Sequence, residues 1–443
     1  MIKRFANWNI AGTGIMLLFI LIPFQGYFTF YKTLSISITQ IIAILLIIYL
    51  IWKKKKQLGS FLTLKEDWAV AAYLAAMVAS ICVSNDKLLS VKYFLKWSSF
   101  IGLYFLAKAS ITDRDVITRT LKLFALTACF VASIGLAEYI AGPDRVLKFL
   151  ATSPIAPLVM EPDTLKQKLI PGNSNWRSWS GNEIVVRNFG TFECAIAFSA
   201  FLGLILPFYF SFKEHGNKRR FIYYLAGAIT LSSLFLNFTR SAYLSLTAVI
   251  LLVAFLNRKN ESFKKIVKLA AVVGFVIAAV ILGNTSIRNT LNSRILTPPP
   301  ASVIPRTTLW ANGVKIFLAH PLLGVGLANY QDGLNRDCPA NAPALPAHNV
   351  YLQIAAETGI AGLITYMMVL LFGLKMSFEV FNGSGSADLR AIGVGFIGMW
   401  VWYLIQSFFD SYLYGDKFSM IFWLMIGLNA SLFEIYKKEK LNV

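Results

Sequence analysis

The stretch Pro346-Ala-His-Asn-Val-Tyr-Leu-Gln-Ile-Ala-Ala-Glu-Thr-Gly-Ile-Ala-Gly-Leu363 leads a short capped helix into a long apolar run. Asn349 is a favourable N-cap residue, and the apolar stripe after it predicts a short helix from Val350 to Glu357. His348, one of three histidines in the chain, therefore lies at the positive end of a helix dipole. A neutral imidazole there can accept a proton, and the alternative is a histidine that only hydrogen-bonds within a folded loop.

Apolar runs of this kind recur along the whole chain. Hydrophobic residues make up 56% of the sequence and charged residues 14%. These values predict an all-α polytopic membrane protein in which residues 1–443 form one transmembrane domain. The runs predict about twelve spans, at 11–29, 34–52, 67–83, 94–111, 121–142, 191–212, 221–238, 241–256, 266–283, 359–378, 390–409 and 418–435.

The basic residues predict the orientation of these spans. With the N-terminus in the cytoplasm, the segments on that side hold 25 of the 42 lysines and arginines, and the short outer segments hold 6. Short cytoplasmic segments are enriched in lysine and arginine, so we expect both termini to be cytoplasmic. Most of the net charge of +20 then follows from topology, which removes the main reason to expect a nucleic-acid partner.

Two long loops are predicted on the outer face, at 143–190 and 284–358. The second contains an amphipathic stretch from Arg306 to Ala319, which predicts a helix. A structureless loop of that length would be unusual, so we expect a small helical cap. The cytoplasmic connections are too short for a domain, which indicates that any chemistry faces outward.

Four residues that could carry chemistry fall on this outer face: His348, Arg187, Arg240 and Arg306. Arg240 lies in a very short turn between two apolar spans, where a charge is costly unless it has a function. Guanidinium groups bind phosphate through two hydrogen bonds and stay charged, so three of them suit a pyrophosphate. The alternatives are an Arg240 that reaches lipid head groups and two solvated loop charges at Arg187 and Arg306.

Several other site types have no support in the sequence. The outer acids are scattered and form no Asp-x-Asp pair, so no metal site is predicted. The four cysteines form no CxxC motif, and the Gly324-Val-Gly326 turn is too short for a nucleotide fingerprint. The spans hold few charges, which disfavours an ion-coupled transporter.

An ordered set of motifs resembles the O-antigen ligase and polymerase superfamily of bacterial envelope glycosyltransferases. The motifs are Arg187-x-x-Gly-Thr-Phe192, Thr239-Arg-Ser-Ala242, Arg306 followed by Leu309-Trp310, Pro321-Leu-Leu-Gly-Val-Gly326 and His348-Asn-x-x-Leu352 with Glu357-Thr-Gly359. The resemblance covers mainly 187–363. One departure is Glu193-Cys194, where many members have a Pro-Asn pair.

The resemblance implies a GT-C-like enzyme of the bacterial inner membrane that needs no metal or cofactor. It implies transfer of a glycan from undecaprenyl pyrophosphate on the periplasmic face, either to lipid A-core in a ligase or to a second lipid-linked glycan in a polymerase. At the positions that match the family motifs, the resemblance implies that His348 is the general base and that Arg187, Arg240 and Arg306 bind the donor pyrophosphate. It implies a supporting role in the site for Asn349 and Tyr351. Displacement by the acceptor would invert the anomeric carbon.

Two classes of function follow from these residues. The first is this transferase, of which we favour the ligase form. The second is a protein that binds or transports a lipid-linked oligosaccharide, which could use the same basic outer pocket without needing His348. Formation of a new glycosidic bond distinguishes the two. The acceptor, the glycan and the oligomeric state are left open by the sequence.

Overall fold

The computed structural model describes residues 10–25, 27–30, 34–53, 62–141, 177–180, 183–209, 211–212, 217–258 and 304–441. Within these residues, eleven helices overlap eleven of the twelve predicted spans, and the remaining span, 266–283, lies outside the described residues. The eleven are α1 (Ile10–Leu21), α2 (Ile38–Lys53), α3 (Lys65–Ile81), α4 (Lys87–Ser110), α5 (Arg114–Ala141), α9 (Ala195–Tyr209), α10 (Asn217–Phe235), α11 (Arg240–Leu256), α16 (Val350–Gly383), α17 (Ala387–Gln406) and α18 (Asp416–Leu441).

Four of these helices, α5, α16, α17 and α18, are long and apolar enough to cross a membrane, judged by length and composition. Shorter apolar helices include α1, α2, α9 and α11. The fold is therefore that of a helical membrane protein, while the number of twelve spans stays a prediction.

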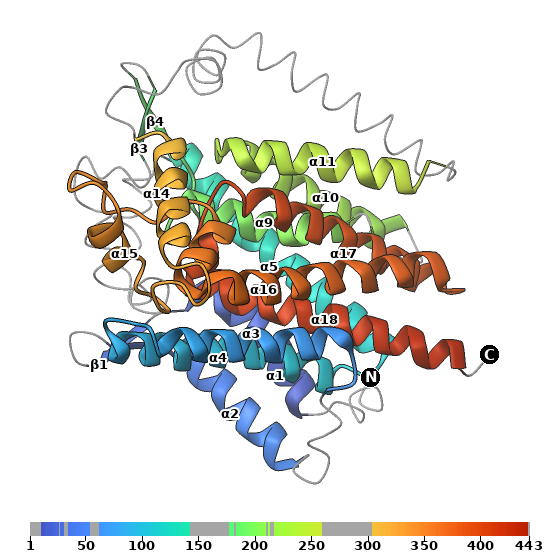
Figure 1. Ribbon diagram of the computed structural model, residues 1–443. Helices are drawn as coiled ribbons and strands as arrows, with labels where there is room; N and C mark the ends of the chain where they lie inside the picture. The colour runs from blue at the N-terminus through green and yellow to red at the C-terminus, as the bar shows by residue number, and fades with distance from the viewer. Residues whose placement is uncertain are drawn as a thin grey trace.

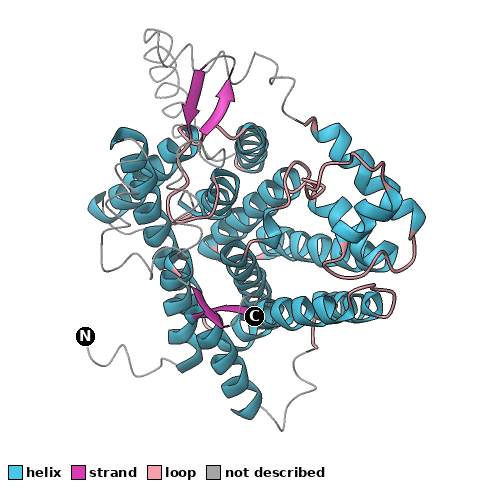
Figure 2. Cartoon of the chain, turned by 90° about the vertical axis from the view of Figure 1, so that its left-hand side faces the viewer, coloured by secondary structure: helices cyan, strands magenta, loops and turns pink. Residues whose placement is uncertain are grey.

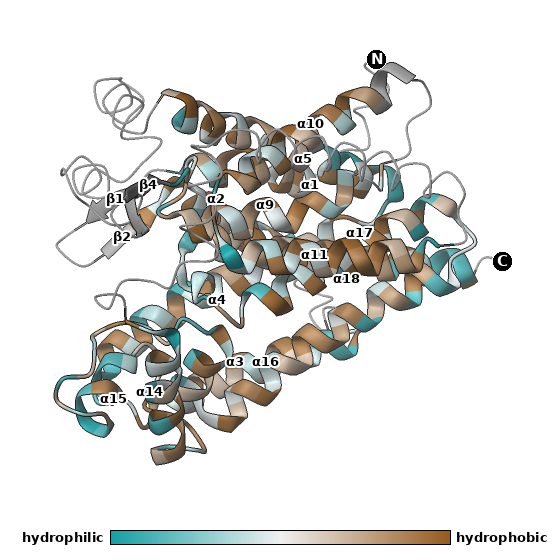
Figure 3. Ribbon diagram, turned by 90° about the horizontal axis from the view of Figure 1, so that it is seen from above, coloured by the Kyte–Doolittle hydropathy of each residue, from teal (hydrophilic) through white to brown (hydrophobic). Residues whose placement is uncertain are grey.

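The helices run side by side, and two shorter helices, α14 (Arg306–Ala319) and α15 (Tyr330–Asp337), lie together at one end of the bundle (Figure 1). We call this the cap end and the other the opposite end. Figure 2 is viewed onto the cap end and shows the connecting loops that gather there. In Figure 3 hydrophobic colour follows the bundle helices, whereas α15 and the region near the C-terminus are more hydrophilic. Polar chain is thus concentrated at the two ends, as a bilayer requires.

Helix α18 is the centre of the bundle. All its residues from Asp416 to Phe433 are buried, and it packs against α4, α16, α5 and α9. From Phe418 to Phe433 its residues are apolar apart from glycine, alanine and the polar Ser419, Asn429 and Ser431, and buried residues lie on every face, which is typical of an enclosed helix. Gly427 permits the closest approach, because a Cβ at that position would come within 2.5 Å of the Tyr104 carbonyl oxygen in α4.

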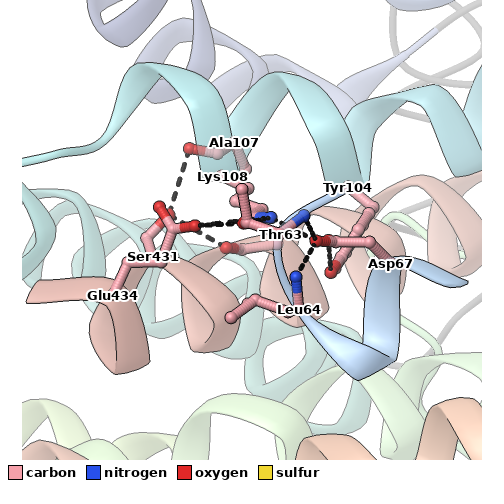
Figure 4. Close-up of polar contacts among 9 residues, drawn as sticks. Thr63, Leu64, Asp67, Tyr104, Ala107, Lys108, Ser431 and Glu434 are labelled. Atoms are coloured by element: carbon pink, nitrogen blue, oxygen red, sulfur yellow. Dashed lines mark hydrogen bonds and ion pairs between the residues drawn. The ribbon is translucent and has the colours of Figure 1, made fainter. Parts of the chain in front are cut away.

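A polar cluster joins α3, α4 and α18 at the opposite end (Figure 4). The Lys108 Nζ donates to the Thr63 hydroxyl at 2.8 Å, forms an ion pair with Asp67 and lies 3.4 Å from Glu434. The Tyr104 hydroxyl also donates to Asp67. Lys108 and Asp67 are both buried, so each charge needs the other to offset the loss of water. The cluster therefore fixes the three helices relative to one another.

Two short antiparallel hairpins were not predicted. They are β1 (Tyr27–Phe30) with β2 (Leu34–Ser37), and β3 (Arg177–Ser180) with β4 (Glu183–Val186). The first corrects a boundary, since the first span was expected to run to 29 and α1 ends at Leu21. Pro23 lies in the short 3-10 helix η2 (Ile22–Phe24) that follows, and it lacks the N–H that a continuing α-helix needs.

The cap rests on the predicted turn from Pro321 to Gly326. Its backbone N–H groups bond to the helix beneath, from Val325 to the Ala356 carbonyl at 2.9 Å and from Gly326 to the Glu357 carbonyl at 3.1 Å. Helix α16 is kinked at Gly359, whose φ is +66° and whose Cβ would come within 2.2 Å of the Leu322 carbonyl oxygen. Only glycine fits this left-handed, crowded position, so the kink separates the predicted short helix from the apolar span.

Candidate functional site

A buried carboxylate, Asp410, brings three polar side chains together at the cap end. It lies between α17 and the 3-10 helix η5 (Tyr412–Tyr414). Its Oδ1 forms an ion pair with Arg306 at the start of α14 and is 3.7 Å from the His348 Nδ1. Its Oδ2 accepts a hydrogen bond of 2.9 Å from the hydroxyl of Ser241 in α11. One side chain thus connects two of the predicted site residues.

His348 has an unusual backbone conformation. Its φ is +47°, and positive φ in a residue other than glycine tends to occur where the surrounding structure holds a functional side chain in place. The Trp310 indole N–H of α14 lies 3.4 Å from the His348 carbonyl oxygen, and its ring packs edge-on against Phe408 with 5.2 Å between the ring centres. The His348 side chain is 31% exposed, so its ring can be reached from outside.

The two predicted supporting residues both have structural contacts. The buried Asn349 caps α16, because its Oδ1 accepts a hydrogen bond of 3.0 Å from the Leu352 N–H. This confirms the predicted N-cap. The Tyr351 hydroxyl donates to the Leu404 carbonyl at 2.9 Å and so ties α16 to α17.

Arg187 reaches the turn between α10 and α11. Its Nε donates to the Asn237 carbonyl at 3.0 Å, and its terminal nitrogen donates to the Thr239 hydroxyl. The buried Asn237 amide in turn donates to the Asn188 carbonyl at 2.7 Å and the Ala195 carbonyl at 2.9 Å. The segment that carries Arg187 is therefore held against this turn by hydrogen bonds in both directions.

The charges of Arg187, Arg306 and Asp410 influence one another. Burial lowers the pKa of Arg187, the Arg306 cation acts in the same direction, and the Asp410 carboxylate opposes them. A guanidinium stays charged even with such a shift. Since Arg306 is 38% exposed and Asp410 is buried, the open side of this group of charges is positive. That side suits an anion.

Glu138 of α5 fixes the loop that follows Arg187. Its Oε2 accepts hydrogen bonds from two successive backbone N–H groups, of Phe189 at 3.0 Å and of Gly190 at 2.8 Å. Gly190 has a φ of +54°, and a Cβ there would come within 2.9 Å of the Phe198 ring. A buried carboxylate that accepts two N–H groups holds a backbone more firmly than a neutral acceptor does.

Replacing Glu138 by alanine should therefore reduce activity through Arg187. Each lost hydrogen bond to a charged group is worth about 1.5–3 kcal/mol, so for an anionic substrate bound by Arg187 we expect about a tenfold or larger rise in KM. Glu138→Gln keeps one acceptor oxygen and should lose less. Ser133→Ala, at an exposed position of the same helix, is the control. Equal KM values in all three variants would contradict this role.

Arg240 begins α11, and its side chain is exposed. Its two neighbours in the chain both belong to the site, since Thr239 accepts from Arg187 and Ser241 donates to Asp410. The backbone thus brings Arg240 to the same end of the bundle as the other three predicted residues.

Asp410 is the residue that sequence reasoning missed. It directly follows the predicted span 390–409, so it was taken only as the first polar residue after a span. The available signal was a lone acid next to the aromatic pair Phe408-Phe409 at the outer end of an apolar run. Within the described residues, no three histidine, cysteine, aspartate or glutamate side chains gather in a way that could hold a metal ion.

Part of the chain is similar to a known protein family. Residues 225–367 match the O-antigen ligase family. The match covers about a third of the chain and includes Arg240, Arg306 and His348, whereas Arg187 and Asp410 lie outside it. No curated protein matches the chain. The match supports a membrane enzyme that transfers glycosyl groups and uses lipid-linked glycans.

Proposed function

We propose that the protein transfers a glycan from undecaprenyl pyrophosphate to lipid A-core oligosaccharide. In this proposal His348 is the general base, and Arg187, Arg240 and Arg306 bind the donor pyrophosphate. The reaction uses no metal and inverts the anomeric carbon. The observation that carries the proposal is the Asp410 carboxylate, which contacts both Arg306 and His348.

The contact with Asp410 suits a base. When the Nδ1–H of His348 points to a carboxylate, the other nitrogen, Nε2, is left to accept a proton. The distance of 3.7 Å is longer than a hydrogen bond, and such contacts often tighten when substrate binds. Asp410 would then stabilise the imidazolium that forms. A protein that only binds or transports its ligand has no need for this pair.

The reaction balances with these residues alone. The acceptor hydroxyl oxygen bonds to the anomeric carbon, its proton passes to the His348 Nε2, and the bond from that carbon to the pyrophosphate breaks. Undecaprenyl pyrophosphate leaves with the electron pair. Arginine side chains that face the departing oxygens stabilise their charge, which is the largest contribution available in a site of this kind. Arg306 has N–H groups to spare, because a guanidinium carries five.

The face of the membrane follows from charge. The predicted cytoplasmic segments carry most of the lysines and arginines, so we place the opposite end in the cytoplasm and the cap end in the periplasm. In this orientation the site faces a lipid-linked glycan donor presented on the periplasmic side of the bacterial inner membrane, and both termini lie in the cytoplasm.

An assay of the purified protein tests the proposal. Donor and lipid A-core are mixed with the enzyme in nanodiscs, and both the new glycolipid and the released undecaprenyl pyrophosphate are measured. We expect both products in equal amounts, and at the same rate in EDTA.

Three other outcomes would contradict the proposal in different ways. Movement of the donor across the membrane without formation of a glycosidic bond would indicate a transporter. Extension of the donor glycan without lipid A-core would make it a polymerase. Loss of activity in EDTA with rescue by Mg²⁺ would require a metal site.

A further inference from the structure

Helix α14 carries apolar side chains on two opposite sides. Leu309 and Ile316 are buried on one side, where α14 packs mainly against α16 and α15 among the residues that the structure describes. Val314 and Leu318 are four residues apart, share the other side of the helix and are exposed. Leu318 is 68% exposed, and Leu322, four residues further along the chain, is 72% exposed. This second apolar side needs an apolar neighbour as much as the first one does.

The other cap helix presents a different surface. Gln331, Asn335 and Arg336 of α15 are exposed, whereas its apolar residue Leu334 is buried. The outer surface of α15 is therefore polar, in agreement with its hydrophilic colour in Figure 3. Water suits the exposed surface of α15, but it does not suit the exposed side of α14.

The exposed side of α14 continues into the side of α16 that faces lipid. Ile360, Ile364 and Leu371 share one face of α16 and are exposed. They belong to a helix that is long and apolar enough to cross a membrane, so acyl chains cover them there. The Ile360 N–H donates to the Pro321 carbonyl at 2.8 Å, and Leu322 directly follows Pro321 in the chain. The two exposed apolar surfaces therefore meet at Leu322.

The length of α16 places this meeting point at the edge of the hydrocarbon core. Lys375 and Glu379 form an ion pair of 3.9 Å towards the other end of the helix, and charges of this kind mark the polar boundary. The 19 residues from Ile360 to Glu379 span about 28 Å, and the hydrocarbon core is about 30 Å thick. Any tilt of α16 shortens this projection and moves the outer boundary further into the cap. The core therefore extends at least to Ile360 and Leu322.

Helix α14 runs across the direction of the bundle helices at the cap end, so its axis lies roughly in the plane of the membrane (Figure 1). From these observations we propose that α14 is an interfacial helix, and that Val314, Leu318 and Leu322 contact the acyl chains of the adjacent leaflet. Helices of this type bury their apolar side about 5–10 Å into the boundary between head groups and acyl chains. The exposed Lys315 next to the stripe suits the phosphates of the head groups.

An interfacial α14 holds Arg306 at the depth of the lipid phosphates. Arg306 begins the helix, and Leu318 follows it by about 18 Å along the axis. A helix that lies in the interface presents both residues at a similar depth, so the arginine meets phosphate groups of a membrane-bound ligand without leaving the interface. The contact with lipid itself does not depend on the transfer reaction proposed above.

Spin labels on the full-length protein in nanodiscs of phosphatidylethanolamine and phosphatidylglycerol test this placement. The four native cysteines are replaced by serine, and a nitroxide is attached in the variants Leu318→Cys, Leu322→Cys, Leu371→Cys and Asn335→Cys. Collisions with oxygen, which concentrates in lipid, are compared with collisions with a water-soluble nickel chelate. We expect the ratio at Leu318 and Leu322 to resemble that at Leu371 of α16. Asn335 of α15 is the matched control in the same cap, and its ratio should be severalfold lower.

Photolabelling of the unmodified protein gives a second measurement, which alone decides if the cysteine-free chain does not fold. A phospholipid with a diazirine in its acyl chain is irradiated in the nanodisc, and labelled residues are identified by mass spectrometry. We expect labels on α14 and α16 and none on α15. A ratio at Leu318 and Leu322 like that at Asn335, or no acyl-chain label on α14, would overturn the proposal. A nitroxide at Leu318 that neither reagent reaches would also overturn it, because protein would then cover the stripe. Neither measurement uses transfer activity, so failure of the proposed function is a separate result.

Discussion

Replacing His348 by alanine should slow single-turnover transfer by about 10²–10⁴-fold, the usual contribution of a general base. Donor binding should remain, because the arginines that we propose to bind the pyrophosphate are untouched. Folding should also remain, because the imidazole is 31% exposed and its ring contacts Asp410 at 3.7 Å rather than packing in the core. The measurement needs three values from one purified variant: melting temperature, donor affinity and single-turnover rate.

A purely structural role for His348 gives a different pattern, in which stability, donor binding and transfer fall together. The variant Asp410→Asn further distinguishes a structural role of His348 from a catalytic one. It keeps the shape of the side chain, removes the charge next to the imidazole, and should lower transfer while Ser241 keeps a hydrogen-bond partner. Near-normal transfer by a well-folded His348→Ala variant would remove this residue from the mechanism.

Arg306→Lys should lower transfer by about 30- to 1000-fold, although the charge is kept. Lysine lacks the planar fork that binds two oxygens of a phosphate, and losing a contact to a departing oxyanion costs about 2–4 kcal/mol in the transition state. The ammonium can still pair with Asp410, so the start of α14 should stay in place. Arg306→Ala should lose at least as much. Single-turnover rates and donor affinities measure the effect.

Arg336→Lys is the control for this substitution. Arg336 lies on α15 of the same cap, is exposed and pairs with Asp337 at 3.2 Å, away from Asp410. The exchange there should change neither rate nor affinity. Wild-type rates in both Arg306 variants with normal melting temperatures would mean that no leaving-group contact is made at this position.

Local signals in the sequence were sufficient for several elements. The helix from Arg306 to Ala319 was predicted with the bounds that the structure gives it, because its apolar residues have helical spacing. The cap at Asn349 and the break at Gly359 were equally local, since each depends on one residue type at the end of a periodic run. Burial of apolar residues then brings such elements together.

The centre of the site depends on contacts that sequence separation hides. Asp410 is 104 residues from Arg306 and 169 from Ser241, so no spacing along the chain indicates that they touch. The two hairpins were missed for a related reason. Each is short and is held by strand pairing rather than by a strong alternation of side chains. By contrast, the end of α1 could have been predicted from a local feature of the sequence, because Pro23 follows it.

The meeting of four chain segments at one carboxylate bears on how such an enzyme avoids wasting its donor on water. The proposed base and one of the arginines both contact Asp410, and that arginine begins the cap helix α14. A movement of α14 away from Asp410 would therefore separate the arginine that we propose to hold the leaving group from the imidazole that we propose to take the proton. In the proposed mechanism, attack by water needs both groups at once, so an arrangement with the cap displaced from Asp410 would suppress hydrolysis of the donor.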